Sequence, residues 1–309
     1  MRASVLMVRE GFARLARRIA EIEGRPDSSA ARNTPLAEWA GALAGAPAHP
    51  APARQLLSPR RGGALLPLGI VDVDRLLSGG LRRNALHEIR AAETRDASAA
   101  SGFATALLAR LAGLDDRPIL LVIEEEAARE GGLPYGPGLD QLGLDPSRLV
   151  VVATRRPQEA LWVFEEGLRC AGLAAVLCEL RGHPKTLDLT ASRRLALRAR
   201  DSGVMGLLLR QAAVAEPGAA LTRWRVTPRP AATVDDFTEG IGRPAWQLDL
   251  ERNRAGPTGR FDLEWDHGAF RFALAADAPA LPVAGTALPL DRPHLAGAAG
   301  TVLALRRAS

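Results

Sequence analysis

The segment from Leu86 to Leu111 reads as a short strand, a turn and a helix, which is the layout of a nucleotide-binding phosphate loop. Such a loop needs glycines so that backbone N–H groups can point at the phosphates, a lysine for the β and γ oxygens, and a Ser or Thr hydroxyl for magnesium. The turn instead offers Ala91, Ala92, Glu93, Thr94, Arg95, Asp96, Ala97 and Ser98. The single lysine of the chain, Lys185, lies far downstream. Asp96 would place a carboxylate where an anion should bind, so the sequence predicts a nucleotide-binding scaffold that no longer hydrolyses nucleotide.

No other group of residues in the sequence points to catalysis. The five histidines show no metal-ligand spacing with each other or with the two cysteines; they are His49, His87, His183, His267 and His294. His87 lies inside an apolar strand and reads as a satisfied core residue. There is no Ser-His-Asp arrangement and no G-x-S-x-G elbow. We therefore expect no metal, no cofactor and no catalytic residue.

The composition is that of a globular protein with an uneven charge. The chain has 309 residues, 24% charged and 47% apolar, with a formal net charge of +5. Residues 120–170 carry nine acidic and five basic side chains, whereas residues 181–210 carry seven basic and two acidic ones. The excess of arginine over lysine fits a G+C-rich coding sequence, and it fits equally an acidic partner such as DNA.

The sequence favours a reducing compartment and no membrane anchor. Cys170 and Cys178 are the only cysteines, too few for a disulfide framework. No apolar run is long enough to span a bilayer, and the N-terminus lacks the apolar region of a secretory signal. We expect a cytoplasmic protein associated with the nucleoid.

An apolar stripe at the N-terminus predicts an amphipathic helix over residues 1–23. Its members are spaced alternately three and four residues apart, and they are Val5, Val8, Phe12, Leu15, Ile19 and Ile22. Two interpretations stay open, a helix that packs on its own domain and a helix that docks on another subunit. A linker rich in Pro and Ala follows over residues 24–64, and a low-complexity tail covers residues 276–309.

Between these segments, residues 65–275 read as an α/β core. The expected strands are Ala85–Ile89, Ile119–Glu124, Leu149–Thr154, Ala174–Leu180 and Val204–Arg210. The expected helices are Ala97–Ala112, Pro157–Ala171 and Thr190–Ser202, with a short one near Gly138–Leu142. Unbroken apolar strands separated by helices indicate a mostly parallel sheet covered on both faces. Trp246–Asn253 and Gly259–Asp266 read as an antiparallel hairpin added to the sheet edge.

The order of these features resembles the RecA-like recombinase core. LGIVDVDRLLSGGLRRNALHEI at Leu68–Ile89 is similar to the recombinase lead-in, and the run Ile119–Val152 is similar to the strand and turn that follow. The motifs GPGLDQLGLDPSRL, EALWVFEEGLRC and LERNRAGPTGRFDLEWDH, with the Arg-rich N-terminal helix, resemble the ImuA family more specifically. That family comprises RecA-related accessory proteins of bacterial error-prone translesion synthesis (SOS mutagenesis). The resemblance covers roughly residues 1–275.

The resemblance also shows how the nucleotide site has degenerated. The positions that match the glycines, lysine and threonine of the loop are Ala91, Asp96, Ala97 and Ser98, so only a hydroxyl survives. Glu126, or one of its neighbours Glu124 and Glu125, matches the water-activating glutamate. Glu179 stands near the place of the magnesium-positioning aspartate. The resemblance thus implies a pseudo-ATPase in which Glu126 and Glu179 are vestigial.

Four arginines are candidates for nucleic-acid binding. Arg252 and Arg254 flank Asn253 in a segment that resembles one of a RecA-like branch-migration protein, and on an extended strand they project from the same face. Arg193 and Arg194 lie on one expected helix, where Arg194 and Arg198 form a like-charge pair that needs an acid or anion to answer it. The alternative is an ordinary solvated charged surface at both places.

The function that the resemblance implies is support of damage-induced error-prone synthesis without catalysis. The implied partners are an ImuB-type polymerase homologue and a C-family error-prone DNA polymerase, with RecA, single-stranded DNA and self-association as further possibilities. Two alternatives remain, an active RecA-like ATPase with an atypical loop and an SOS-linked inhibitor of cell division.

Overall fold

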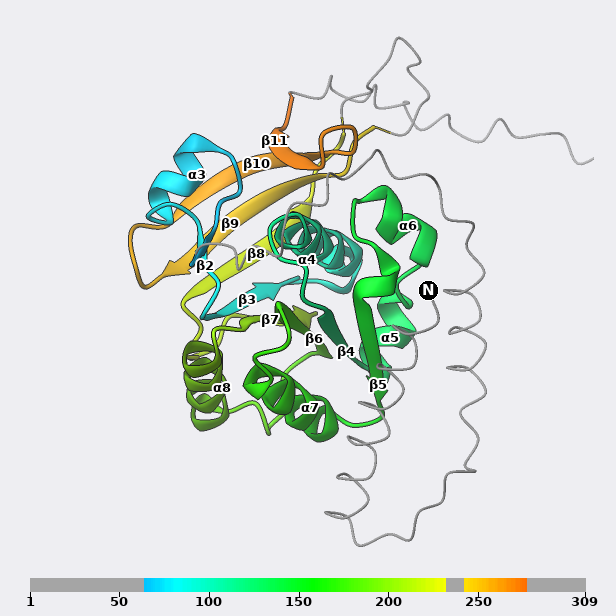
Figure 1. The fold of residues 1–309 in the computed structure, drawn as a ribbon, viewed down its shortest axis with the longest axis vertical. Helices are drawn as coiled ribbons and strands as arrows, with labels where there is room; N and C mark the ends of the chain where they lie inside the picture. Colours follow the sequence, from blue (N-terminus) through cyan, green and yellow to red (C-terminus); the bar gives the residue numbers. More distant parts are fainter. Residues whose placement is uncertain (1–63, 232–241, 277–309) are drawn as a thin grey trace, which may run out of the picture.

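The computed structural model describes residues 64–231 and 242–276, which form a sheet with helices on both faces (Figure 1). The nine strands of the sheet stand in the order β11-β10-β9-β8-β3-β7-β6-β4-β5. The structure is therefore α/β with a mostly parallel sheet, as the sequence predicts. The expected helix over residues 1–23, and almost all of the linker and of the C-terminal tail, lie outside the described residues.

Six strands run parallel to one another. They are β3 (Leu86–Arg90), β4 (Ile119–Glu124), β5 (Leu149–Thr154), β6 (Ala175–Arg181), β7 (Met205–Gln211) and β8 (Thr222–Pro228). Strands β3, β4 and β7 are buried along their whole length, and so is nearly all of β6, because helices cover both faces. The first five strands coincide with the predicted ones or are shifted by one residue. The sequence did not predict β8.

Three antiparallel strands extend the sheet beyond β8. They are β9 (Ala245–Asn253), β10 (Gly259–Asp266) and β11 (Arg271–Leu274). The hairpin formed by β9 and β10 confirms the predicted one, with its strands starting one residue earlier or at the predicted residue. It does not form the edge, however, because β11 pairs with the outer side of β10.

The helices occupy both faces of the sheet. They are α4 (Ala97–Ala112), α5 (Glu125–Gly131), α6 (Gly136–Gln141), α7 (Pro157–Arg169) and α8 (Leu189–Ser202), with short 3-10 turns η1 (Thr94–Asp96) and η2 (Pro146–Arg148). In Figure 1, α4 lies on one side of the central strands, and α7 and α8 lie on the other. Both α7 and α8 begin with residues that favour the start of a helix. Helix α7 has Pro157 at its first position, and the Asp188 side chain, just before α8, accepts a hydrogen bond from Ala191 N.

Two apolar cores fix these layers. The core beneath α4 contains an aromatic cluster, in which the Phe103 ring lies about 6 Å from the rings of Trp224, Trp246 and Phe272. The core beneath α7 and α8 is built on Phe164 and on Leu and Val side chains of β4, β6 and β7. Each core spans several strands, so the carboxyl ends of the strands are held at one common edge.

A small subdomain precedes the central sheet. It consists of β1 (Leu65–Leu66), the short helix α3 (Val71–Leu76) and β2 (Leu81–Arg82), and β1 pairs with β2 antiparallel. None of the helices within residues 64–231 and 242–276 is long and apolar enough to cross a membrane.

Candidate functional site

The predicted phosphate turn joins β3 to α4 at the carboxyl edge of the parallel strands, the edge where such sheets bind ligands. Ala91 N donates to the Arg210 carbonyl at 2.9 Å, and the Ala91 carbonyl accepts from Ala213 N at 2.9 Å. The sheet therefore uses both backbone groups of Ala91. No residue from 91 to 98 has a positive φ, whereas a phosphate nest alternates right-handed and left-handed backbone. The turn does not have the shape of a phosphate cradle.

Asp96 stands at the residue that precedes α4 and is only 5% exposed. Ala97 beside it is also buried, and Ser98 is exposed. The N-terminus of a helix favours negative charge, which is why bound phosphates are found there. In this chain a carboxylate of the protein already stands at that end of α4.

A buried polar cluster lies one turn further along α4. Oε1 of Glu179, at the end of β6, accepts from Ser101 Oγ at 2.9 Å and from Gln211 Nε2 at 2.5 Å. Gln211 Nε2 also donates to the Ala127 carbonyl of α5 at 3.3 Å. Burial raises the pKa of Glu179, against the two hydrogen bonds, which lower it. We call Ser101, Glu179 and Gln211 the polar lock, because they tie α4, α5, β6 and β7 together.

The other glutamate singled out from the sequence, Glu126, lies apart from the polar lock. Its carboxylate is exposed and pairs with Arg129 at 2.8 Å, and Arg129 also pairs with Glu125. The buried carboxylate at the end of β4 is instead Glu124, which is 3% exposed and accepts from Arg181 N at 3.3 Å. No described contact joins Glu126 to Glu179. Within the described ranges, no three His, Cys, Asp or Glu side chains converge as metal ligands.

A different site forms around the connector from β7 to β8, residues 212–221. Four arginines donate to it or pair with it, and they are Arg210, Arg223, Arg252 and Arg254. Arg252 Nη1 and Arg254 Nη2 both donate to the Gly218 carbonyl at 2.8 Å. The two candidate arginines thus meet at one atom, and both donate to the backbone of the connector.

The arginines around the connector are only partly neutralised. Glu88, at 3% exposed, pairs with Arg223 at 2.7 Å and lies 3.5 Å from Arg210. Partial burial lowers the pKa of Arg252, and repulsion by Arg223 and Arg254 lowers it further. This arrangement favours an anion beside Arg252 and Arg254, because an anion would offset the repulsion.

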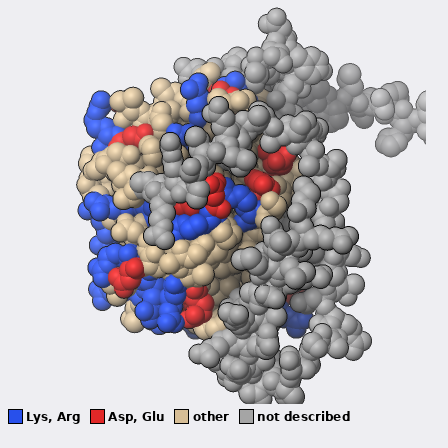
Figure 2. Space-filling model, viewed as in Figure 1, with Lys and Arg blue, Asp and Glu red and all other residues tan. Residues whose placement is uncertain are grey.

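Helix α8 contacts the same connector through Ser192, the residue before Arg193 and Arg194. Arg193 and Arg194 are exposed, and Ser192 Oγ accepts from Ala219 N at 2.8 Å. The like-charge pair of Arg194 and Arg198 is answered by Glu165 of α7, at 2.7 Å and 3.6 Å. On the face shown in Figure 2, Lys and Arg side chains gather over α8. Arg252 and Arg254 therefore contact residue 218, and Arg193 and Arg194 follow Ser192, which contacts residue 219. The residues that the sequence analysis matched to the nucleotide loop lie at the carboxyl edge instead.

Comparison with known proteins identifies the family. No family model matches the chain. Protein ImuA of Caulobacter vibrioides, strain NA1000/CB15N, is 34% identical over 213 residues, which cover 64% of this chain and 83% of that protein. Protein ImuA of a second strain, ATCC 19089, matches to the same extent. This chain belongs to the ImuA family. The membership supports a role in DNA-damage-inducible mutagenesis.

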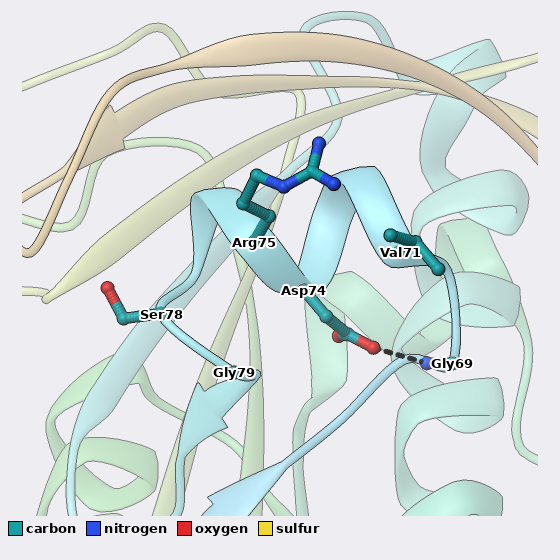
Figure 3. A pocket seen from close by; sticks show the side chains of 6 residues that line it. All are labelled: Gly69, Val71, Asp74, Arg75, Ser78 and Gly79. Atoms are coloured by element: carbon teal, nitrogen blue, oxygen red, sulfur yellow. Dashed lines mark hydrogen bonds between the residues drawn. The ribbon is translucent and has the colours of Figure 1, made fainter.

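The structure of this ImuA family member also has an open hollow beside α3, lined by Gly69, Val71, Asp74, Arg75, Ser78 and Gly79 (Figure 3). The Asp74 carboxylate already has two hydrogen-bond donors within the protein, because it accepts from Leu68 N at 2.7 Å and from Gly69 N at 2.8 Å. Asn253 is paired with Thr222, the first residue of β8, and its side chain donates to the Leu76 carbonyl at the end of α3. Helix α3 and the hollow beside it therefore lie at the amino edge of the sheet. It is separate from the polar lock.

Two members of the polar lock of this ImuA chain, Ser101 and Gln211, were missed by sequence reasoning. Gln211 ends the apolar strand β7, and Ser101 lies in the second turn of α4. A polar residue at the carboxyl end of a predicted parallel strand is the signal that could have indicated Gln211. Ser101 carries no such signal, since its role depends on a contact with residue 179.

Proposed function

We propose that this ImuA family member is a non-catalytic RecA-like accessory protein of damage-induced error-prone translesion synthesis, working in the cytoplasm at the nucleoid. The observation that carries the proposal is the polar lock. Oε1 of Glu179 is bound by two side chains of the protein, and the neighbouring turn lacks the backbone shape that phosphates require. The site is thereby filled with internal contacts that tie elements of the fold together.

A nucleotide assay tests the non-catalytic part. We expect no magnesium-dependent ATP turnover above background and no thermal stabilisation by millimolar ATP, since saturating binding stabilises a protein by a few kcal/mol, about 2.7 at 100 times Kd. The matched variants are Glu124→Gln and Glu126→Gln, which remove one buried and one exposed carboxylate. Hydrolysis that either variant abolishes would establish the alternative, an active ATPase with an atypical loop.

The proposed partners are an ImuB-type polymerase homologue and a C-family error-prone polymerase, with RecA as a third. Their support is the family membership and the implied role. Each purified partner should bind the full chain in a pull-down at physiological salt. Specific capture of a division GTPase, with neither polymerase retained, would favour the alternative of a cell-division inhibitor.

We propose a second, separate activity, which is weak binding of single-stranded DNA through Arg193, Arg194, Arg252 and Arg254. The supporting observation is that Arg252 and Arg254 both donate to the Gly218 carbonyl and repel each other, while Arg193 and Arg194 are exposed on α8, whose Ser192 contacts Ala219 of the same connector. Arg254→Ala should weaken binding alike for all sequences and reduce the salt slope by about 0.7 per lost phosphate contact.

The matched control for that experiment is Arg260→Ala. Arg260 is also exposed and lies on a neighbouring strand, but it pairs with Asp249. Its loss should leave the salt slope unchanged. Equal slopes for Arg254→Ala and the unmutated protein would assign Arg254 to the connector alone.

A further inference from the structure

The outward face of helix α8 carries a line of alternating leucine and arginine side chains. Leu189, Arg193 and Leu197 are spaced four residues apart, and Arg200 follows three residues later, so all four lie on one face of the helix. We call these four residues the α8 ridge. The opposite face of α8 packs on the protein through the buried side chains Ala191, Ser192, Leu195 and Ala199. The ridge therefore takes no part in the apolar core.

The leucines of the α8 ridge are open to solvent. Leu189 is 37% exposed and Leu197 is 47% exposed. A single exposed leucine is ordinary on a protein surface, but here two lie on one face, two turns apart, with an arginine between them. Side chains spaced four residues apart form the kind of row that packs into the groove of a second helix. The ridge extends for about 16 Å along the helix axis, enough for three turns of such a partner.

The α8 ridge lies between two contacts that α8 makes within the protein. On one side, Arg194 and Arg198 pair with Glu165 of α7, which packs beside α8 (Figure 1). On the other side, Ser192 Oγ accepts from Ala219 N of the connector. The ridge faces away from both, so neither α7 nor the connector covers it.

The charge on the α8 ridge is mostly unanswered. Arg193 has no ion-pair or hydrogen-bond partner among the described residues. Arg200 pairs only with the adjacent Asp201, at 3.3 Å, and both side chains are more than 60% exposed. Such surface pairs contribute little to stability. Basic side chains gather over α8 in Figure 2, and residues 181–210 carry seven basic and two acidic side chains. A partner that covers the ridge must therefore combine apolar side chains with carboxylates.

We propose that the α8 ridge is a docking surface for an acidic amphipathic helix of another protein. The partner's apolar side chains pack against Leu189 and Leu197, and its Asp or Glu side chains pair with Arg193 and Arg200. The leucines favour a protein over DNA here, because contacts with phosphates use positive charge and have no need of aliphatic side chains. This surface goes beyond the DNA binding proposed above. The two share Arg193, so a docked helix competes with DNA there.

Fluorescence anisotropy of two labelled acidic peptides on the full chain tests the proposal. The first peptide is a helix of about four turns, with leucines four residues apart and glutamates beside them. The second has the same composition in scrambled order, so it keeps the charge and lacks the apolar face. The first peptide should bind at least about tenfold more tightly than the second at physiological salt.

A leucine variant tests the place of binding. Leu189→Ser/Leu197→Ser removes two exposed apolar side chains and keeps every charge, so it should fold normally by thermal unfolding. It should weaken binding of the first peptide about tenfold or more, and leave binding of single-stranded DNA unchanged. The matched control is Leu133→Ser/Leu274→Ser, which removes two exposed leucines outside α8. The control should bind the first peptide as the unmutated protein does.

A charge-reversed variant tests the pairing. Arg193→Glu/Arg200→Glu should lose the first peptide and should bind a version of it that has lysine in place of each glutamate. Non-specific attraction of acidic peptides to a basic protein predicts no such gain, because the remaining arginines are unchanged.

Four results would overturn the proposal. Absence of binding of the first peptide, or equal binding of the two peptides, would remove the evidence for a helix with an apolar face. Unchanged peptide binding by Leu189→Ser/Leu197→Ser would place the peptide elsewhere on the molecule. An equal loss in Leu133→Ser/Leu274→Ser would make the effect a general one of exposed leucines. Weaker DNA binding by the α8 leucine variant, with peptide binding unchanged, would assign the ridge to nucleic acid.

Discussion

Glu179 is a buried carboxylate that is held by two side chains of the protein. Its Oε1 accepts from Ser101 and Gln211, and the whole side chain is 8% exposed. A buried carboxylate is costly when charged, so its burial raises its pKa. The hydrogen bonds that Ser101 and Gln211 donate to the uncharged form of Glu179 therefore contribute to the stability of the fold.

The protonation of Glu179 gives a prediction on stability. The pKa of Glu179 in the folded protein lies above the usual value of 4.5. The contribution of this side chain to the free energy of unfolding is therefore fully present below pH 4.5, and it is lost as the pH rises through the folded pKa. Glu179→Gln keeps an uncharged acceptor and should be more stable than the unmutated protein at neutral pH. Glu179→Ala should be less stable, by about 1–3 kcal/mol for each buried donor left without a partner. Urea unfolding at pH 4 and pH 7.5 measures both.

His87 should show the opposite dependence on pH. It is 1% exposed, and its ring nitrogens lie 2.8 Å from Thr222 Oγ1 and from the Arg82 carbonyl. Burial lowers its pKa from 6.5 to about 4. The contribution of neutral His87 to the free energy of unfolding is present above pH 6.5 and is lost as the pH falls toward 4. The loss amounts to about 3 kcal/mol, because each unit of pKa shift corresponds to about 1.36 kcal/mol. Unfolding of His87→Gln should lack this dependence, and an equal dependence in both proteins would contradict the assignment.

At the scale of residues, the sequence predicted which chemical groups occupy the turn after β3, but it did not predict which side chains are buried or bonded to each other. The absence of glycine and lysine from the turn after β3 was readable directly, and His87 was correctly interpreted as a core residue with both nitrogens bonded. The burial of Glu124, rather than Glu126, could not be read from three consecutive glutamates. It depends on where β4 ends and α5 begins.

At the scale of elements, β8 is the one parallel strand that the sequence did not reveal, and it carries alternating arginines. Strand β8 reads TRWRVTP, and its Arg223 is 4% exposed because it pairs with Glu88 of β3. Alternating arginines suggest a solvent-facing segment when seen alone. The partner that makes burial possible is 135 residues away, so no local pattern contains it. Strands β4 and β5 are apolar runs, and β6 and β7 are mostly apolar, which was sufficient to predict them.

The packing of α7 on the sheet gives a prediction at the same scale. A Cβ on Gly167 would lie 2.6 Å from Leu120 Cδ2 and 3.0 Å from Val176 Cγ2, so α7 approaches β4 and β6 closely. Gly167→Ala should therefore lower the free energy of unfolding by about 1–3 kcal/mol, despite the better helix propensity of alanine. Gly172→Ala is the control, since its Cβ would meet nothing nearer than 3.7 Å. Thermal unfolding of the two variants should separate them clearly.

At the scale of the whole molecule, the sheet has one interior and two unlike edges. Strand β3 lies near its centre, between β7 and β8, and is buried at all five residues. Amides of β3 and β7 should exchange only by global opening, whereas those of β11 should exchange by local fraying. Mass spectrometry of exchanged peptides measures this order. Equal protection of β3 and β11 would mean that the nine strands open as one unit.

The position of β3 also has a consequence for how the protein is made. Its two neighbours are synthesised long after it, and Glu88 meets Arg223 only when 135 further residues have been added. At a translation speed of about 5–20 residues per second, this delay is roughly 7 to 27 seconds. For most of that interval, until β7 has been added, the hydrogen-bonding groups of β3 have neither of their partner strands, while β4 and β5 can already pair. A ribosome-bound chain that ends before β7 is therefore the stage at which chaperones are most needed.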